Sequence, residues 1–180
     1  VGCSTCVLSA FCFLLLVAHA GGLAANPGWE VFPESCSKPA CTRVTLENPQ
    51  RAGNRPLLWF RGQSSAEVRQ ELRRWATERV NWPEACEWVE GGPEEQRAGG
   101  LARAFCRTAR WGFVDDVAWE LSAPTCGGSS GVLVEVHSES RIGQGDMGLN
   151  SHRVNAIWRF LRNGTKAPVS PPVAWPREDC

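Results

Sequence analysis

Residues 132–161 read VLVEVHSESRIGQGDMGLNSHRVNAIWRFL, and this stretch decides the fold because the spacing of its apolar residues changes halfway along. In the first part, valines alternate with other residues from Val132 to Val136, which predicts a strand with one buried face. In the last part, apolar residues recur at helical spacing, in the stripe Val154, Ile157, Trp158 and Leu161. The sequence therefore predicts a strand, a loop and a helix that packs on a core, with Asn150 as the cap of the helix.

The same two spacings recur upstream of this stretch. Alternating or apolar runs bounded by Gly, Pro and Ser predict further strands at residues 42–47, 86–90, 101–110 and 114–121. Ser64 and Glu67 have the Ser-x-x-Glu spacing of a capping box, and an apolar stripe follows at Val68, Leu72, Trp75 and Ala76. We therefore expect an α+β domain, with an antiparallel sheet of about five strands covered on its apolar face by two helices.

An uncharged apolar segment, residues 1–25, precedes this domain. Cys6 to Ala18 reads CVLSAFCFLLLVA, and Ala18-His19-Ala20 has the small-x-small form of a signal-peptidase site. Two fates fit this segment: a cleaved export signal, or an N-terminal apolar helix that anchors the protein in the lipid bilayer through residues 6–25. Either fate places the domain in a non-cytosolic compartment. The rest of the chain divides into a linker at 26–35, the α+β domain at 36–163 and an extended Pro-rich tail at 164–180.

The composition excludes one class of partner and indicates an oxidising compartment. The 19 basic and 19 acidic residues cancel, and nucleic-acid binding normally needs a basic face, so we expect no nucleic-acid partner. Nine cysteines are many for a cytosolic domain. Those beyond the apolar segment suggest disulfides, with buried free thiols as the alternative. We expect a local disulfide between Cys36 and Cys41, because Pro39 between them suits a tight turn, and the other pairings cannot be read from the sequence.

The loop Gly143–Gly148 reads GQGDMG and matches the G-x-G-x-x-G pattern of a dinucleotide site. That interpretation fails because no second parallel strand follows the helix. Asp146 would also place a carboxylate where the pyrophosphate should approach the helix. The cysteines show no pair of pairs at zinc-finger spacing, and the three histidines are scattered. We therefore expect neither a cofactor nor a metal.

A longer match surrounds this loop. Residues 138–153, SESRIGQGDMGLNSHR, resemble the signature S-x-S-R-x-G-x-x-D-x-G-x-N-x-x-R of the family called domain of unknown function 1499. Residues 111–117, WGFVDDV, look like the G-F-x-D-D-V segment of that family. The element from Cys36 to Cys41 is similar to its C-P-x-x-P-N-C element, with Ser37 and Ala40 where Pro and Asn are usual. The resemblance implies bacterial exported or membrane-linked relatives and plastid relatives, and it brings no activity with it.

The candidate site residues are the polar and glycine positions of these segments: Asp115, Asp116, Ser138, Ser140, Arg141, Gly143, Asp146, Gly148, Asn150 and Arg153. We expect a structural role, with Asp146 held by loop amides or an arginine. Arg141 and Arg153 would then pair with Asp146, Asp115 or Asp116. The alternative is a small-ligand site in which the two arginines and the helix N-terminus hold an anion, or a cryptic hydrolase. No nucleophile elbow or comparable signature marks a catalytic residue.

The function we expect is that of a non-enzymatic, membrane-tethered accessory or scaffolding subunit that docks on a larger membrane complex. The plastid relatives make a photosynthetic complex and the thylakoid lumen the favoured setting, with the periplasm or secretion as alternatives. The location of the charged groups separates this role from ligand binding. Buried side chains paired with one another favour scaffolding, and charges that converge on an open pocket favour a ligand.

Overall fold

The elements of the fold are seen in a computed structural model that describes residues 31–46, 55, 57–78, 84–89, 100–123, 125–126 and 129–163. Their order is β1 (Cys41–Val44), β2 (Leu58–Arg61), α2 (Ser65–Thr77), β3 (Glu84–Val89), β4 (Gly100–Thr108), β5 (Val114–Ser122), β6 (Thr125–Cys126), β7 (Ser129–Ser140) and α3 (Leu149–Arg162). The predicted apolar helix within residues 1–25 and the predicted tail at 164–180 lie outside the described residues. In the described part of the chain, neither helix has the length and apolar character needed to span a membrane.

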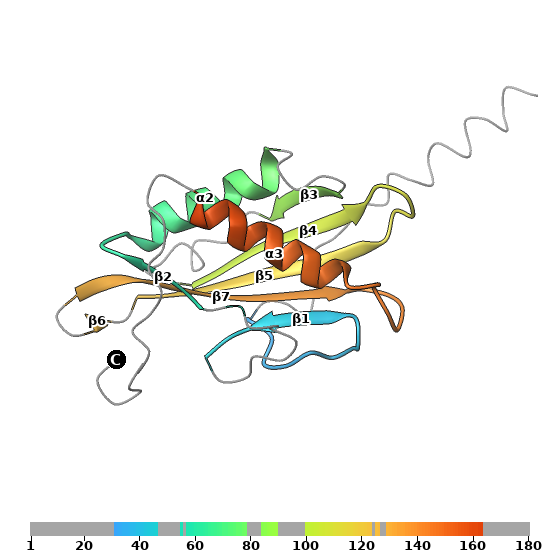
Figure 1. Cartoon of the computed structure of the whole chain (residues 1–180), viewed down its shortest axis with the longest axis horizontal. Helices are drawn as coiled ribbons and strands as arrows, with labels where there is room; N and C mark the ends of the chain where they lie inside the picture. Colours follow the sequence, from blue (N-terminus) through green and yellow to red (C-terminus); the bar gives the residue numbers. More distant parts are fainter. Residues whose placement is uncertain are drawn as a thin grey trace, which may run out of the picture.

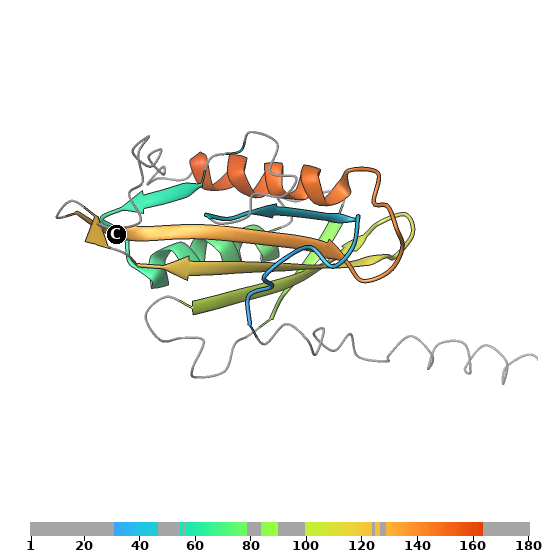
Figure 2. The same ribbon diagram turned by 90° about the horizontal axis from the view of Figure 1, so that it is seen from below.

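The sheet is built around β7, the longest strand. The order of strands is β1-β7-β5-β4-β3, and every pair is antiparallel. β2 lies end to end with β1 along the same edge of β7 (Figure 2). Six strands therefore share one sheet, and β6 adds a two-residue pairing to the start of β7. The prediction of about five strands missed β2, which is too short for a clear alternation.

Both helices cover one face of this sheet, as predicted (Figure 1). Ser64 caps α2 through the predicted capping box: its Oγ accepts a hydrogen bond from the Glu67 amide, and its own amide donates to the Glu67 carboxylate at 2.8 Å. The two predicted apolar stripes are buried, Val68, Leu72, Trp75 and Ala76 on α2 and Val154, Ile157, Trp158 and Leu161 on α3. Hydrophobic burial of these stripes against the sheet is what joins the two layers.

Tryptophans fill the centre of the core between α2 and the sheet. The Trp75 ring meets the Trp119 ring edge-on at 5.8 Å between centroids, and Trp88 stacks on Trp119 at 6.0 Å. Trp75 and Trp119 are fully buried. Offset and edge-to-face pairs of this kind stabilise a core beyond the area that they bury, which gives the tryptophan-rich composition a structural role.

The opposite face of β7 is also partly buried, although the alternation predicted only one buried face. Leu133 and His137 point away from the helices, yet they are 1% and 0% exposed. Residues 31–40 lie over His137, whose ring is met edge-on by Phe32 at 6.4 Å. The predicted disulfide between Cys36 and Cys41 is confirmed and ties this segment to β1. A second disulfide joins Cys86 and Cys106, which face each other in the register of β3 and β4.

Candidate functional site

A buried polar network centred on Arg153 lies between α3 and the sheet. The guanidinium donates from Nε and Nη2 to Glu84 at 2.8 and 2.5 Å, and from Nη2 to Asp115 at 2.6 Å. Nη1 donates to Ser138 Oγ at 2.9 Å and to Asn150 Oδ1 at 2.6 Å. All five N–H groups of the guanidinium are therefore engaged. Burial alone would lower the pKa of Arg153, but its bonds to Glu84 and Asp115 raise it above its ordinary value.

Asn150 belongs to this network and does not cap α3, so that prediction was wrong. The helix begins at Leu149, and its N-cap is Gly148, at φ 80°, with no side-chain cap bond. Asn150 lies inside the first turn with its side chain fully buried. Its Oδ1 accepts from Ser138 Oγ at 2.7 Å, and its Nδ2 lies 2.9 Å from Ala40 O. An Asn just before an apolar stripe can occupy either the N-cap of a helix or a position inside its first turn. The tertiary contacts of Asn150 decide in favour of the second.

Asp146 satisfies the first backbone donors of α3 in place of Asn150. Its Oδ1 accepts from the Gly148 amide at 3.0 Å, and its Oδ2 accepts from the Asn150 amide at 2.8 Å. Burial alone would raise the pKa of Asp146, but these hydrogen bonds lower it below its ordinary value. The glycines on either side supply the turn, since Gly143 has φ 89° and Gly148 has φ 80°. Asp146 is thus held by loop amides, the first of the two arrangements that the sequence suggested.

Arg141, the first arginine of the signature, lies on the other face of the sheet. Arg141 donates twice to Asp116, from Nε at 2.9 Å and from Nη2 at 2.7 Å. Neighbouring residues of a strand point to opposite faces, so Asp115 faces the helices and Asp116 faces away from them. Arg153 pairs with Asp115, and Arg141 pairs with Asp116. The two arginines therefore lie on opposite faces of the sheet. They do not converge on one anion site.

His137 forms a separate polar cluster beneath residues 31–40. Its Nε2 lies 2.9 Å from Glu139 Oε2 and 3.7 Å from Cys41 Sγ, and its Nδ1 lies 3.3 Å from Arg43 Nη1. Ser37 also donates to Glu139. Burial alone would raise the pKa of Glu139, but the hydrogen bonds from His137 and Ser37 lower it.

This cluster bears on the metal and hydrolase alternatives. Cys36, Cys41 and His137 bring one potential ligand atom each within 4.8 Å of one another, as do Glu84 and the Cys86–Cys106 pair. In both groups the sulfurs are joined as disulfides, so a metal would compete with the S–S bond. His137 also points to the opposite face of β7 from Ser138 and Ser140, so it is placed away from the hydroxyls of both candidate serines.

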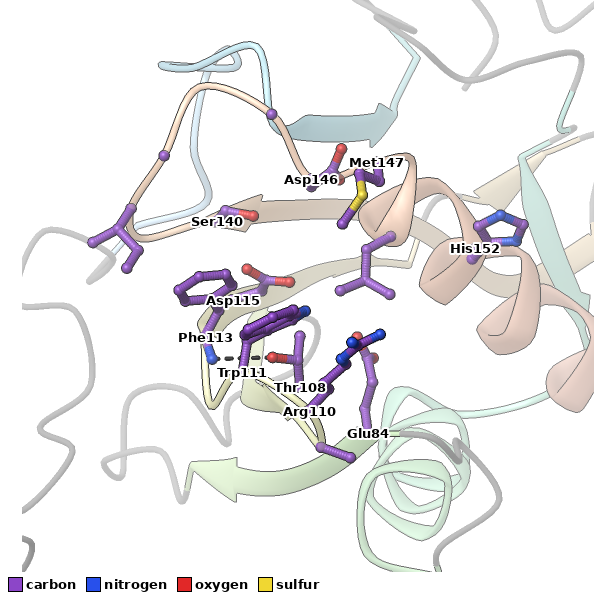
Figure 3. A pocket seen from close by; sticks show the side chains of 15 residues that line it. Glu84, Thr108, Arg110, Trp111, Phe113, Asp115, Ser140, Asp146, Met147 and His152 are labelled. Carbon is purple, nitrogen blue, oxygen red and sulfur yellow. Dashed lines mark hydrogen bonds between the residues drawn. The ribbon is translucent and has the colours of Figure 1, made fainter.

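A pocket opens between the β4–β5 turn and the loop that leads into α3, with a volume of about 470 Å³. Trp111 and Phe113 line it from the turn, and Ile142 and Met147 line it from the loop. Its polar lining comes from Glu84, Asp115, Ser140 and Asp146 and also from Thr108, Arg110 and His152 (Figure 3). The structure thus places four of the candidate residues in one pocket, Asp115, Ser140, Gly143 and Asp146. Ser138, Asn150 and Arg153 lie in the network behind it, Gly148 begins the adjoining helix, and Asp116 and Arg141 lie on the far face.

Sequence reasoning missed several residues of the site. Glu84 is 69 residues from Arg153, and no local pattern marks it as the partner of that arginine. Arg43 likewise meets His137 only through the pairing of β1 with β7. One signal was available: His137 and Glu139 are two residues apart on a predicted strand, so their side chains share a face.

Comparison with known proteins extends the resemblance to most of the described domain. The family model described as "Protein of unknown function (DUF1499)" matches residues 33–161. No curated protein and no solved structure shows a significant match. The matched range runs from the segment over His137 to the last buried residue of α3, so it includes the pocket and both polar clusters.

Proposed function

The chain belongs to the DUF1499 family, and from this premise we propose that its domain is a non-enzymatic accessory module that docks on a partner protein of a larger membrane complex. The pocket between the β4–β5 turn and the loop before α3 is the proposed docking site. The sequence supports the membrane setting, because the uncharged run from Cys6 to Ala18 suits an anchor. The plastid relatives implied by the family favour a photosynthetic complex and the thylakoid lumen, which we retain as part of the proposal.

One observation carries the docking role. Within the described residues, six large hydrophobic side chains are exposed, and four of them, Trp111, Phe113, Ile142 and Met147, line this one pocket. Met147 is 93% exposed and Trp111 is 60% exposed. Apolar side chains gathered at one hollow of a surface, rather than scattered over it, are typical of protein interaction sites.

The charged groups of the signature support this role over catalysis. The buried residues Arg153, Asp115 and Asn150 are bonded to one another or to their neighbours. Arg153 has no N–H left for an anion. Ser138 donates to Asn150 and accepts from Arg153, so no base holds its hydroxyl as a nucleophile would require. By the criterion set out from the sequence, buried pairs of this kind favour a scaffold.

The pocket variant Trp111→Ala/Met147→Ala tests the proposal in the full-length protein purified from its native membrane. We expect the double variant to lose the partner that accompanies the wild type and to keep the same melting temperature, since both side chains are exposed. Val31→Ala/Leu46→Ala is the matched control, because among the described residues these are the two large exposed hydrophobics that lie outside the pocket. A photo-crosslinking residue at position 147 should join the same partner. A partner that the pocket variant retains, or that crosslinks only elsewhere, contradicts the proposal.

A further inference from the structure

The pocket combines an apolar rim with an acidic interior. Trp111, Phe113, Ile142 and Met147 form the rim, and the carboxylates of Glu84, Asp115 and Asp146 line the interior. Figure 3 shows Asp115 beside the rings of Phe113 and Trp111, with Ser140 and Asp146 across from it. A purely apolar occupant would leave these carboxylates without solvent, and an anion would be repelled by them.

The buried charge at the base of the pocket is only partly neutralised. Glu84 and Asp115 share a single guanidinium, that of Arg153, whose N–H groups are all engaged. Asp115 is 2% exposed, and only its Oδ2 has a hydrogen-bond partner among the described residues. Its Oδ1 therefore keeps its accepting capacity in a pocket that the same side chain lines. An unbonded carboxylate oxygen that borders a pocket favours a donor that carries positive charge.

The aromatic rim suits a cation as well. The Arg110 guanidinium already lies 4.8 Å from the centroid of the Trp111 ring, so one face of this ring accepts a positive group. Arg110 and His152 are the basic side chains that line the pocket, and both are exposed. Long basic side chains place their methylene stems on apolar surface and their charge at a polar end. The apolar rim of the pocket suits such a stem, and its acidic interior suits the charge.

We propose that the occupant of the pocket is a lysine or arginine side chain of the docked partner segment. Its stem lies against Trp111, Phe113, Ile142 and Met147, and its charged group donates to Asp115. This inference rests on the proposed docking function and specifies the chemistry that the partner presents.

Three acetylated, amidated pentapeptides test the inference by calorimetry with the full-length protein in detergent. They are identical except for lysine, norleucine or glutamate at the centre. We expect the lysine peptide to bind about tenfold more tightly than the norleucine peptide, because a charge-assisted bond to Asp115 adds to the same apolar contact. The glutamate peptide should show no binding. Trp111→Ala should weaken the binding of the lysine peptide and of the norleucine peptide by a similar factor.

Two further variants test how much the charges of Asp115 and Arg110 contribute to peptide binding. Asp115→Asn should make the lysine and norleucine peptides bind equally. Because Asp115 also pairs with Arg153, this variant could fail to fold, so Arg110→Gln serves as an exposed second variant. Removing the competing cation of Arg110 should raise the affinity of the lysine peptide by roughly two- to fivefold. An unchanged or weaker affinity in Arg110→Gln contradicts the inference.

The outcomes separate this inference from the proposed function. Equal binding of the lysine and norleucine peptides, lost in Trp111→Ala, overturns the basic occupant and leaves apolar docking in place. Tighter binding of the glutamate peptide also overturns it. Absence of binding by all three peptides overturns the basic occupant, and the docking role is then decided by the crosslink from position 147 to the native partner.

Discussion

Asn150 Oδ1 lies 2.6 Å from Arg153 Nη1, so one buried amide positions the guanidinium that pairs with both Glu84 and Asp115. Both residues sit in the first turns of α3, and their partners come from β7, β5 and β3. The start of the helix is thereby joined to three strands by hydrogen bonds rather than by apolar contact. Low local polarity strengthens such a network when every member is satisfied, and it makes a single deletion costly.

Asn150→Ala should therefore destabilise the domain more than Asp146→Ala, the reverse of the order expected if Asn150 were only a cap. The Asn150 change leaves buried donors of Ser138 and Arg153 without an acceptor, at about 1–3 kcal/mol for each such group. The loss of amide bonds to Asp146 resembles the loss of a cap, about 1 kcal/mol. Urea unfolding followed by tryptophan fluorescence gives both values, with the exposed Asn163→Ala as the control. A larger loss in Asp146→Ala than in Asn150→Ala would contradict this prediction.

Arg153→Met should lower the free energy of unfolding by about 3–5 kcal/mol, because it leaves the Asp115 and Glu84 carboxylates buried without their cation. Arg162→Met is the matched control, since Arg162 is an exposed arginine in the last turn of the same helix. Its effect should stay within about 0.5 kcal/mol. If the two variants unfold at the same urea concentration, the buried pairs contribute no stability.

Asp146→Asn should destabilise the domain in a pH-dependent way. The pKa of Asp146 is lowered in the folded state, so its charge stabilises the fold above the ordinary aspartate pKa of about 3.9. That contribution is lost as the pH falls through the lowered, folded-state pKa. The stability gap between wild type and variant should be full at about pH 6 and should close as the pH falls below about 4. A gap that stays constant over this range would mean that the carboxylate charge plays no part.

The two disulfides should contribute unequally to stability. Cys86–Cys106 closes a separation of 20 residues, and Cys36–Cys41 closes one of 5. Loop-closure entropy then gives about 3 kcal/mol for the first and about 2 kcal/mol for the second. Replacing each pair by alanines and comparing unfolding midpoints under non-reducing conditions measures the difference. Equal midpoints for the two variants would show that strain or residual structure outweighs loop length.

Local patterns identified the parts of the fold that depend on nearby residues. The capping box of Ser64 and Glu67 spans three residues, and both elements of the box form as predicted. The apolar stripes of α2 and α3 could be read for the same reason, because helical spacing brings residues i, i+3 and i+4 onto one face. The local disulfide of Cys36 and Cys41 belongs to this class as well.

Long-range pairing decided the features that the sequence did not show. Glu84 meets Arg153 across 69 residues, and Arg43 meets His137 across 94. Asn150 was assigned to the wrong role because its partners, Ser138 and Ala40, are contributed by β7 and by the residue before β1. The pocket escaped prediction for the same reason, since its walls come from two loops that the sheet brings together.

The central place of β7 sets the order in which this chain can fold while it is being made. β4 and β5 are joined by a short turn and can pair as soon as both exist. Among the described strands, β1 and β2 pair with β7 alone, and Cys41 lies 96 residues before its neighbour His137. Closing so long a loop is slow compared with local pairing. A nascent chain that stalls before β7 would hold two strands with free edges, which are prone to pair with other chains.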